Sequence, residues 1–467
     1  MPGREVPAIR RARRPRRGRA GYHCRQIRGA VLKVLLVTIG SRGDIQPYVA
    51  LGKGLARAGH EVTLCSSAAY ADSVRAQGLS YGHMGNGFVE LMTSLEGRAG
   101  LERMGSLTGA LRTVIGLARR VRPLQQEMLE DAWRVATQVR PDIILVHPKL
   151  PGVLDMADAL GVPAIVAPLF PQLVATSAFP AVGFPDLRLG AGYRRGTYRL
   201  VDAITQRVAG GAIRAWRRNN GLGPRPPRQG LFARRDGSPW PMLHGYSAAL
   251  CPRPDDWPAS ATVTGFWTLD TPSAWQPPVA LRAFLEAGAP PVYIGFGSMA
   301  GRSPQRLTSI VLDALTRSGQ RGILATGWGG LTEHALPEGV FAVAEAPHDW
   351  LFPRVAAVVH HGGAGTTAAG LRAGRPTVVC PFFGDQPFWG RRVHALGAGP
   401  EPIPQRRLSA PRLAEAITRA VSDPAMRLAA LRIQSRLQAE RGIDTAVAQI
   451  EAIHARHAKN RADQRHA

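Results

Sequence analysis

Two histidines and three glycines stand together in one short segment, His360-His361-Gly362-Gly363-Ala364-Gly365-Thr366-Thr367. The segment follows an apolar run that is typical of a buried strand, and it precedes a helical pattern. Small residues let the backbone approach a diphosphate, and a helix start offers unpaired N–H groups and a positive dipole end. A purely structural turn is the alternative. We interpret the segment as an anion cradle whose candidate binding residues are His361, Gly363, Ala364, Gly365 and Thr366.

A second polar group follows the next predicted strand, in the segment Pro381–Pro387. Asp385 can accept hydrogen bonds and Gln386 can both donate and accept them, which neighbouring sugar hydroxyls require. The alternative is that Asp385 only caps the next helix. Ser298 ends the turn Gly295-Phe296-Gly297-Ser298 and is a candidate for holding a phosphate oxygen, although a lone GxG is weak evidence against a plain turn.

An acidic residue suited to proton transfer ends the loop Gly40-Ser41-Arg42-Gly43-Asp44, directly after the first predicted strand. A carboxylate beside an alcohol can act as a general base, so Asp44 is the candidate catalytic residue. Its alternative role is to cap the following helix. Arg42 either steadies charge in the same loop or is solvated.

Short β-rich runs alternate with helical patterns in the first part of the chain. This rhythm is typical of a doubly wound parallel sheet. The predicted strands are Lys33–Ile39, Glu61–Cys65, Asp142–Val146 and Ala164–Pro168, and the predicted helices are Ile45–Ala58 and Ala68–Gln77. After Phe170 the pattern becomes irregular, and a helical stretch at Tyr198–Asn219 indicates an insertion.

A second series of the same kind starts at Pro291. Its predicted strands are Val292–Phe296, Gly322–Thr326, Val340–Ala344, Ala356–Val359 and Thr377–Cys380, and its helices are Pro304–Ser318, Ala410–Val421 and Pro424–Glu440. Two tandem Rossmann-like domains should face each other across a cleft, because ligands bind at the carboxyl ends of parallel strands. The expected parts are a disordered Arg-rich tail (1–30), an acceptor-binding domain (31–265), a linker (266–290), a donor-binding domain (291–455) and a tail (456–467).

Composition limits the class of protein. The 467 residues carry a net charge of +26, but beyond the Arg-rich segment 1–30 the cations are dispersed, so we expect no specific nucleic-acid partner. The four cysteines form no CxxC pair, which argues against a zinc site and fits a reducing cytoplasm. Prolines break the longest apolar tract, Ala159–Phe184, so no transmembrane segment is predicted and we expect a cytoplasmic protein, peripheral to membranes at most.

Taken together, these segments resemble glycosyltransferase family one, which has the GT-B fold, over almost all of the chain from Val31 to about Ile453. The string HHGGAGTTAAGLRAGRPTVVCPFFGDQPFWG and the segment PHDWLF (Pro347–Phe352) are especially similar to the sterol glucosyltransferase branch. The string GSRGDIQPYVALGKGLARAGHEVTL resembles that branch and also the antibiotic glycosyltransferases.

The resemblance implies an inverting transfer of a hexose, with UDP-glucose the favoured donor, to a hydroxyl of an apolar acceptor such as a sterol. The nucleotide sugar is then a co-substrate, with no other cofactor and no required metal. Asp44 matches the proposed base. In the donor site, His361 and Ser298 match residues that contact the donor diphosphate, and Gly363 to Thr366 match its backbone cradle. Asp385 and Gln386 match the pair that binds the hydroxyls of the transferred sugar.

Two departures from the plant small-molecule branch qualify these roles. That branch has a His where this chain has Asp44, and a base-stacking Trp near where Glu345 stands, so the manner of nucleobase recognition stays open. The acceptor is also left open. Its pocket is expected to be lined from about Phe88 to Arg120 and from Phe170 to Asn219, two segments that are broadly apolar and basic.

Other functions compete with this interpretation. A natural-product glycosyltransferase that acts on an antibiotic, polyketide or carotenoid alcohol with a UDP- or dTDP-sugar is the main alternative. A nucleotide-sugar epimerase and a catalytically inactive lipid- or sugar-binding module are two more. A Rossmann oxidoreductase is disfavoured, because no G-x-G-x-x-G follows Lys33–Ile39 and no acidic residue ends Glu61–Cys65.

Overall fold

The computed structural model describes residues 30–94, 107–224, 230–234, 236–271, 275–297, 304–326 and 336–466. The Arg-rich segment predicted to be disordered therefore lies outside the described residues, apart from Ala30. Ser298 is outside them as well. Residues Leu32–Ala467 form one compact unit, which the following description concerns.

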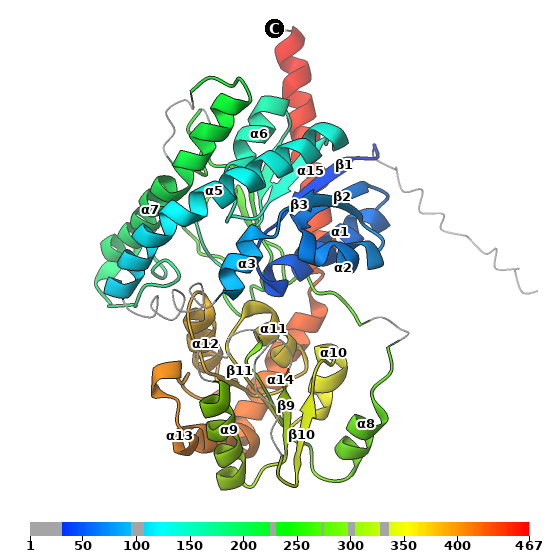
Figure 1. The fold of residues 1–467 in the computed structure, drawn as a ribbon, viewed down its shortest axis with the longest axis vertical. Coiled ribbons are helices and arrows are strands. Elements are labelled where there is room, and N and C mark those ends of the chain that lie inside the picture. The colour runs from blue at the N-terminus through cyan, green and yellow to red at the C-terminus, as the bar shows by residue number, and fades with distance from the viewer. Residues whose placement is uncertain are drawn as a thin grey trace, which may run out of the picture. The chain divides into compact units, whose positions relative to one another are not determined.

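The first half of this unit is built on a parallel seven-stranded sheet of order β3-β2-β1-β4-β5-β6-β7 (Figure 1). Its strands are β1 (Lys33–Val37), β2 (Glu61–Ser67), β3 (Ser80–Met84), β4 (Ile143–Val146), β5 (Ala164–Val166), β6 (Met242–His244) and β7 (Ala261–Val263). Its helices are α1 (Arg42–Arg57), α2 (Ala71–Ala76), α3 (Gly87–Thr93), α5 (Leu107–Val139), α6 (Val153–Leu160) and α7 (Gly190–Asn219), with the 3₁₀ turn η1 (Ala68–Tyr70).

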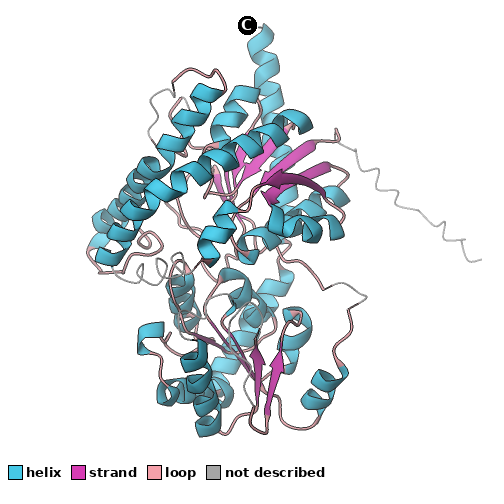
Figure 2. Cartoon of the chain, in the orientation of Figure 1, coloured by secondary structure: helices cyan, strands magenta, loops and turns pink. Residues whose placement is uncertain are grey.

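The second half is built on a parallel five-stranded sheet of order β10-β9-β8-β11-β12 (Figure 2). Its strands are β8 (Val292–Gly295), β9 (Gly322–Ala325), β10 (Val340–Val343), β11 (Ala357–His360) and β12 (Thr377–Val379). The surrounding helices are α8 (Val279–Glu286), α9 (Pro304–Ser318), α10 (His348–Leu351), α11 (Ala364–Arg372), α12 (Gln386–Ala395), α13 (Ala410–Ser422), α14 (Pro424–Ala439) and α15 (Gly442–His466), with η4 (Phe352–Arg354) and η5 (Gln405–Arg407).

Each sheet is buried on both faces, which explains why its strands are continuous apolar runs rather than alternating ones. In β1, Leu35 and Val37 pack toward α5, α6 and α7, while Val34 and Leu36 pack toward α1 and α15. In β8, Val292 and Ile294 pack toward α9 and α13, and Tyr293 packs toward α8 and α10. The predicted architecture of two doubly wound parallel sheets is confirmed.

Several elements go beyond the sequence prediction. Strands β3, β6 and β7 and the long helix α5, which runs beside α7 (Figure 1), had not been predicted. Helix α8 lies within the predicted linker, where Leu281 packs on the second sheet. The final helix α15 returns to α1 and continues through the residues expected to be a tail.

The two halves also share apolar packing. Phe179, which follows β5, and Phe388 on α12 have ring centroids 5.7 Å apart. The ring centroid of Tyr246, which follows β6, lies 6.1 Å from that of Trp389 on α12. These contacts bring the segment after β5 against the helix that carries Asp385 at its start. Within the described residues, no helix is long and apolar enough to cross a membrane.

Candidate functional site

The topology places the predicted residues at equivalent points of the two sheets. Strand order reverses at the β1/β4 pair in the first sheet and at the β8/β11 pair in the second. In open parallel sheets, ligands bind beyond the carboxyl ends of the strands at such switch points. The loops that leave β1, β4, β8 and β11 carry, in that order, Asp44, Lys149, Gly297 and His361.

Asp44 lies in the first turn of α1, where its side chain helps to start the helix. Its Oδ2 atom accepts hydrogen bonds from the Ser41 N–H (2.8 Å) and the Ser41 hydroxyl (3.2 Å). Gly40 has φ +130°, and a Cβ there would lie 2.1 Å from Asp44 Oδ2. The capping role that the sequence offered as an alternative is therefore real, but it uses one carboxylate oxygen and leaves Oδ1 facing other groups.

The sequence analysis missed Lys149, which lies in the loop after β4. Its ammonium donates a hydrogen bond of 2.7 Å to Asp44 Oδ1. His147, in the same loop, places Nε2 3.4 Å from that oxygen and is buried. Because His147 Nδ1 accepts the Lys149 N–H, the ring proton is on Nε2, which lies near Asp44 without donating a hydrogen bond to it. His147 is thus a neighbour of Asp44 whose own accepting nitrogen is already occupied.

These contacts fix the charge of Asp44. Burial acts to raise the pKa of Asp44, but the charge and hydrogen bond of Lys149, the His147 ring and the Ser41 N–H together hold the pKa below its usual value of 3.8. Burial lowers the pKa of His147 to about 3, so its ring is neutral at pH 7. Lys149 is therefore the cation that keeps Asp44 ionised.

In the second sheet the two adjacent histidines have different roles. His360 ends β11, is fully buried, and accepts the Gly362 N–H at Nδ1 (2.8 Å), so it shapes the turn. Each histidine also has one buried ring nitrogen without a partner among the described residues, Nε2 in His360 and Nδ1 in His361. Burial lowers the pKa of His361 to about 4, which makes it a neutral ligand at pH 7.

The glycines of this turn are required by close packing. Gly362 has φ +93°, and a Cβ there would lie 2.6 Å from Val379. A Cβ at Gly363 would lie 2.6 Å from His361 Nε2, which is too close unless the His361 ring moved. The first N–H of α11 to bond within the helix is that of Thr367, to Gly363 O (2.9 Å). The preceding amides of Ala364, Gly365 and Thr366 therefore point out of the helix start, as an anion cradle needs.

Asp385 directly precedes α12, and charged residues of the first sheet affect its pKa. Its Oδ2 accepts a hydrogen bond from Trp389 Nε1 (2.9 Å). Burial raises the pKa of Asp385 to about 6; the Trp389 hydrogen bond acts against the rise, the charge of Asp44 adds to it, and Lys149 lowers it. Because the charges of Asp44 and Lys149 in the first half affect the pKa of Asp385 in the second, the candidate residues of the two sheets belong to one site.

Gln386 contributes less than the sequence suggested. Its Oε1 accepts the N–H groups of Phe382 (2.8 Å) and Phe383 (3.2 Å), so the amide oxygen closes the loop after β12. Only its NH₂ group is left to donate to a ligand. A further ion pair joins the two sheets where Arg42 meets Glu345. Arg42 thus pairs with a residue of the other half of the chain. Its partner Glu345 stands near the place where the plant small-molecule branch has a Trp that stacks on the nucleobase.

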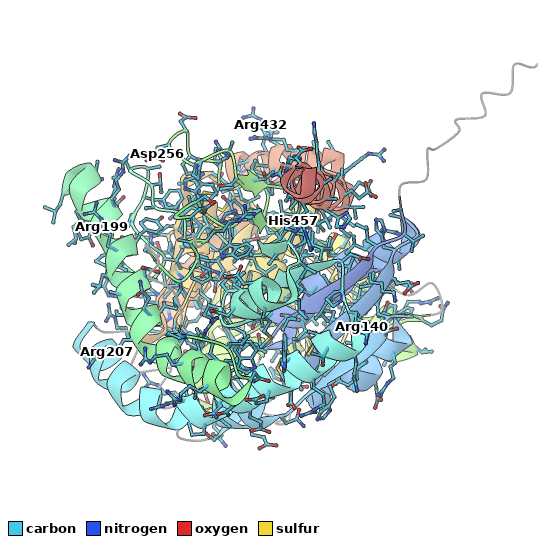
Figure 3. All side chains as sticks on the ribbon, turned by 90° about the horizontal axis from the view of Figure 1, so that it is seen from above. Arg140, Arg199, Arg207, Asp256, Arg432 and His457 are labelled. Atoms are coloured by element: carbon cyan, nitrogen blue, oxygen red, sulfur yellow. The ribbon has the colours of Figure 1, made fainter. Side chains whose placement is uncertain are left out.

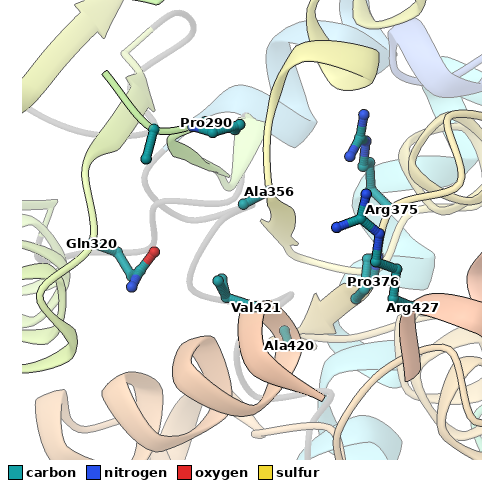
Figure 4. Close-up of a pocket in the computed structure, with 9 residues that line it drawn as sticks. Pro290, Gln320, Ala356, Arg375, Pro376, Ala420, Val421 and Arg427 are labelled. Carbon is teal, nitrogen blue, oxygen red and sulfur yellow. The ribbon is translucent and has the colours of Figure 1, made fainter. Parts of the chain in front are cut away.

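A pocket elsewhere in the second half is separate from this site. It is lined by Ala289, Pro290, Gln320, Ala356, Arg375, Pro376, Ala420, Val421 and Arg427 (Figure 4). Pro290 and Pro376 precede β8 and β12, so the pocket lies at the amino ends of the strands, opposite the edge that carries His361. In the part of the chain that the structure describes, no group of three or more His, Cys, Asp or Glu side chains is arranged to hold a metal ion.

Two family models match the chain, one in each half. Residues 34–178 match the glycosyltransferase family 28 N-terminal domain. Residues 311–453 match the C-terminal domain that is described as erythromycin biosynthesis protein CIII-like. The first match contains Asp44 and Lys149, and the second contains His361, Asp385 and Gln386.

Curated relatives are similar over most of the chain. Two sterol 3-beta-glucosyltransferases of Arabidopsis thaliana are 37% and 36% identical, over 84% and 89% of this chain and 61% and 67% of their own lengths. A sterol 3-beta-glucosyltransferase of Saccharomyces cerevisiae (strain YJM789) is 34% identical over 89% of this chain and 34% of its own length. The chain thus spans about a third to two thirds of the length of these relatives.

Solved structures with the same fold include antibiotic glycosyltransferases. The glycotransferase of kitacinnamycin has a TM-score of 0.66 at 21% identity and covers 91% of this chain and 100% of its own. A calicheamicin glycosyltransferase has a TM-score of 0.64 at 18% identity, with 92% of this chain and 99% of its own covered. At these identities the likeness concerns the fold alone.

Proposed function

Because the chain belongs to the glycosyltransferase family that includes the sterol 3-beta-glucosyltransferases, we propose that it transfers a hexose from a nucleotide sugar to a hydroxyl of a sterol or similar lipid-like alcohol. UDP-glucose is the favoured donor. The observation that carries the proposal is the pairing of an ionised Asp44, beyond β1 of the first sheet, with His361 and Asp385, beyond β11 and β12 of the second. A base, an anion cradle and a sugar-binding carboxylate are the parts that such a transfer needs.

The proposed step uses Asp44 as a general base. As the acceptor oxygen bonds to the anomeric carbon, its proton passes to Asp44, which cannot remove it fully beforehand because an alcohol is a far weaker acid. The bond from that carbon to the diphosphate breaks, and its electron pair leaves with the diphosphate. Attack from the face opposite the leaving group inverts the anomeric centre, so no covalent enzyme intermediate is required.

The residues of the second sheet would stabilise the leaving group. His361 and the amides at the start of α11 are directed at the growing negative charge, where preorganised donors are most effective. Asp385 accepts hydrogen bonds from sugar hydroxyls, and the Gln386 NH₂ group donates to them. Ser298 stays a candidate phosphate contact from the sequence alone.

We propose that the nucleotide sugar is the co-substrate and that the reaction needs neither a resident cofactor nor a metal. The support is that His361 and the α11 amides already provide donors for the diphosphate. Transfer should therefore keep its rate, within about twofold, after dialysis against EDTA. A rate that falls with EDTA and returns with Mg²⁺ or Mn²⁺ would contradict this part of the proposal.

An apolar acceptor is supported by the segment that follows β5. Phe170, Phe179 and Val182 are partly buried and pack on the core of the first sheet. Phe179 also contacts Phe388, which lies three residues after Asp385. An apolar molecule held along this segment would have its hydroxyl near both carboxylates.

A peripheral membrane contact follows from the surface next to this segment, and it too is a proposal. Leu187, Leu189 and Leu200 are 54%, 66% and 49% exposed. The exposed Arg188, Arg199 and Arg207 accompany them, and Figure 3 shows Arg199 and Arg207 along α7. Apolar side chains flanked by cations suit an anionic lipid surface, where each cation contributes about 1 kcal/mol.

The membrane contact can be tested with vesicles. Replacing Leu187 and Leu189 by Ser should reduce co-sedimentation with phosphatidylserine vesicles several-fold, and salt should reduce it further. The control replaces Val279 of α8, which is 86% exposed, by Ser, and this change should leave sedimentation unchanged. Equal loss in both variants, or sedimentation that ignores lipid charge and salt, would rule this surface out.

The function itself is tested by a donor and acceptor panel. UDP-glucose, other UDP-sugars and dTDP-sugars are each offered with sterol, carotenoid and polyketide alcohols, and products are identified by mass. The proposal expects a hexosylated sterol from UDP-glucose, with nucleotide released only when acceptor is present. Products formed only from polyketide or carotenoid alcohols would favour the natural-product alternative, and nucleotide-sugar isomerisation without acceptor would indicate an epimerase.

A further inference from the structure

The Asp44 carboxylate has little free hydrogen-bonding capacity in this structure. Oδ2 accepts two hydrogen bonds from Ser41, and Oδ1 accepts one from Lys149 at 2.7 Å. The His147 Nε2 atom lies 3.4 Å from Oδ1. A carboxylate offers about four lone-pair positions and three of them accept hydrogen bonds here, so an acceptor hydroxyl has to bond to Oδ1, where it shares the oxygen with the Lys149 ammonium.

Lys149 is the neighbour that is able to yield. The Ser41 N–H is part of the start of α1, and the His147 side chain is 1% exposed. The Lys149 side chain is 43% exposed and reaches Asp44 through a flexible four-carbon stem. Its ammonium lies beside Gly40, where a Cβ would be 2.9 Å from Nζ, so the glycine leaves the space that the ammonium occupies.

We propose that Lys149 is the positioning residue of the base: its ammonium orients Asp44 Oδ1 in the free protein and gives up part of that position to the acceptor hydroxyl. This inference rests on the proposed function. Lys149 stays protonated throughout and only exchanges a hydrogen bond. The hydroxyl proton passes to Asp44 as the new bond to sugar forms.

The surroundings of Asp44 leave this task to Lys149. Burial raises the pKa values of Tyr48 and Tyr70, and burial lowers that of His147 to about 3, so all three are neutral at pH 7. Asp385 adds negative charge, and Arg42 is paired with Glu345. A buried carboxylate without the ammonium would bind its proton more tightly.

Replacing Lys149 by Met tests the proposal through pH. Without the ammonium, we expect Asp44 to resemble Asp385, whose pKa burial raises to about 6. A carboxylate with that pKa is only about one quarter ionised at pH 5.5, so the ratio of kcat/KM for the acceptor, variant over wild type, should fall about fourfold between pH 8.5 and pH 5.5. Any ionisation common to both proteins cancels in this ratio. Lys149→Arg should keep the ratio nearly constant with pH, and Lys53→Met, a lysine of α1 that contacts Gln77, should give a flat ratio.

A double-mutant cycle separates positioning from general damage. In an Asp44→Asn background, Lys149→Met should change transfer by less than twofold, since there is no carboxylate to position. The same loss in both backgrounds would overturn the proposal. So would a raised KM for the nucleotide sugar with an unchanged acceptor profile, because Lys149 would then contact the donor.

A stability measurement tests Lys149 independently of transfer. The folded-state pKa of Asp44 is depressed in wild type, so its ionisation stabilises the fold above about pH 4; in Lys149→Met the raised pKa reverses that sign. The difference in Tm between wild type and Lys149→Met should therefore grow from pH 4 to pH 7, and it should be constant with pH in the Asp44→Asn background. A constant difference in both would overturn the proposal, whereas an absence of transfer by wild type with every donor would count against the proposed function alone.

Discussion

Each of the two sheets contributes one partly buried carboxylate to the site, and the pKa values of these two groups move in opposite directions. Asp44, beyond β1, has its pKa held below 3.8, and Asp385, beyond β12, has its pKa raised to about 6. Both are removed from water, so burial alone does not separate them. The difference is that the Lys149 ammonium bonds to Asp44 at 2.7 Å, whereas Asp385 is bonded by neutral groups, the Trp389 N–H and its own backbone N–H.

This difference assigns separate work to the two carboxylates. A group that is ionised at every working pH suits proton abstraction, and environments that separate paired pKa values identify such roles. Asp385 instead titrates near pH 6, with a neutral His361 and the helix start of α11 on its own side of the site. Because its folded-state pKa is above the unfolded one, ionising Asp385 lowers the free energy of unfolding as pH rises from about 4 to 6.

The largest effect that tests the comparison is expected for Asp44→Asn. This change keeps the size of the side chain but removes the proton acceptor, so transfer should fall by on the order of a hundredfold or more. Donor affinity should change little, because the cradle belongs to the second sheet. Initial rates with varied acceptor and varied donor measure both quantities.

The control for this variant is Asp142→Asn. Asp142 accepts the Lys33 N–H at the opposite edge of the same sheet, and its variant should keep transfer within about twofold. If Asp44 only supported the start of α1 as the N3 residue of a capping box, its own change to Asn would cost equally little transfer, because the Asn amide oxygen can still accept the Ser41 N–H. Transfer within a few-fold of wild type would therefore place the base elsewhere.

His361→Ala should have the opposite effect, weakening use of the donor and leaving use of the acceptor unchanged. Loss of a hydrogen bond to a charged group costs about 1.5 to 3 kcal/mol, or roughly tenfold to hundredfold in kcat/KM for the donor, with acceptor KM unchanged. His394→Ala, an exposed histidine on α12, is the control and should behave like wild type. Unchanged donor kinetics in His361→Ala would remove this residue from the donor site.

Residues of the candidate site could be predicted from sequence where their signal is local. The glycines, histidines and small residues from His360 to Thr366 form one short run, and the structure places them at the end of β11, in the turn that follows and in the first residues of α11. The strands β1, β8 and β11 were predicted for the same reason, since a buried parallel strand is a continuous apolar run. The strands β6 and β7 were not predicted although they are as long as β5 and β12, because no continuous apolar run marks them: β6 (MLH) ends in a histidine and β7 (ATV) has a threonine at its centre.

No motif in the sequence around Lys149 indicates that it belongs to the site, so it could not be predicted from local sequence. It is separated from Asp44 by 105 residues and meets it only because β1 and β4 are neighbours in the sheet. The same holds for α15, which follows the second sheet in sequence but packs on α1 of the first. Contacts of this kind depend on strand order, which the alternation of elements does not determine.

The smallest expected effect concerns Trp389, whose N–H is the hydrogen bond that favours ionised Asp385. In Trp389→Phe this bond is lost, so the pKa of Asp385 should rise further above about 6. A hydrogen bond worth about 1 kcal/mol corresponds to roughly 0.7 of a pKa unit. If ionised Asp385 binds the sugar, kcat/KM for the donor rises with pH through this pKa, and the midpoint of that rise should move to higher pH by about that amount.

At pH 8 the variant should differ little from wild type, and near pH 6 it should be a few-fold slower. Loss of ring volume in the shared core would also weaken the protein, but it would lower rates at every pH. Phe388→Leu separates the two effects, because Phe388 packs on Trp389 and Phe179 without bonding to Asp385. If Phe388→Leu moved the midpoint as far as Trp389→Phe does, packing rather than the hydrogen bond would set the ionisation of Asp385, and the contrast with Asp44 would not depend on their bonding partners.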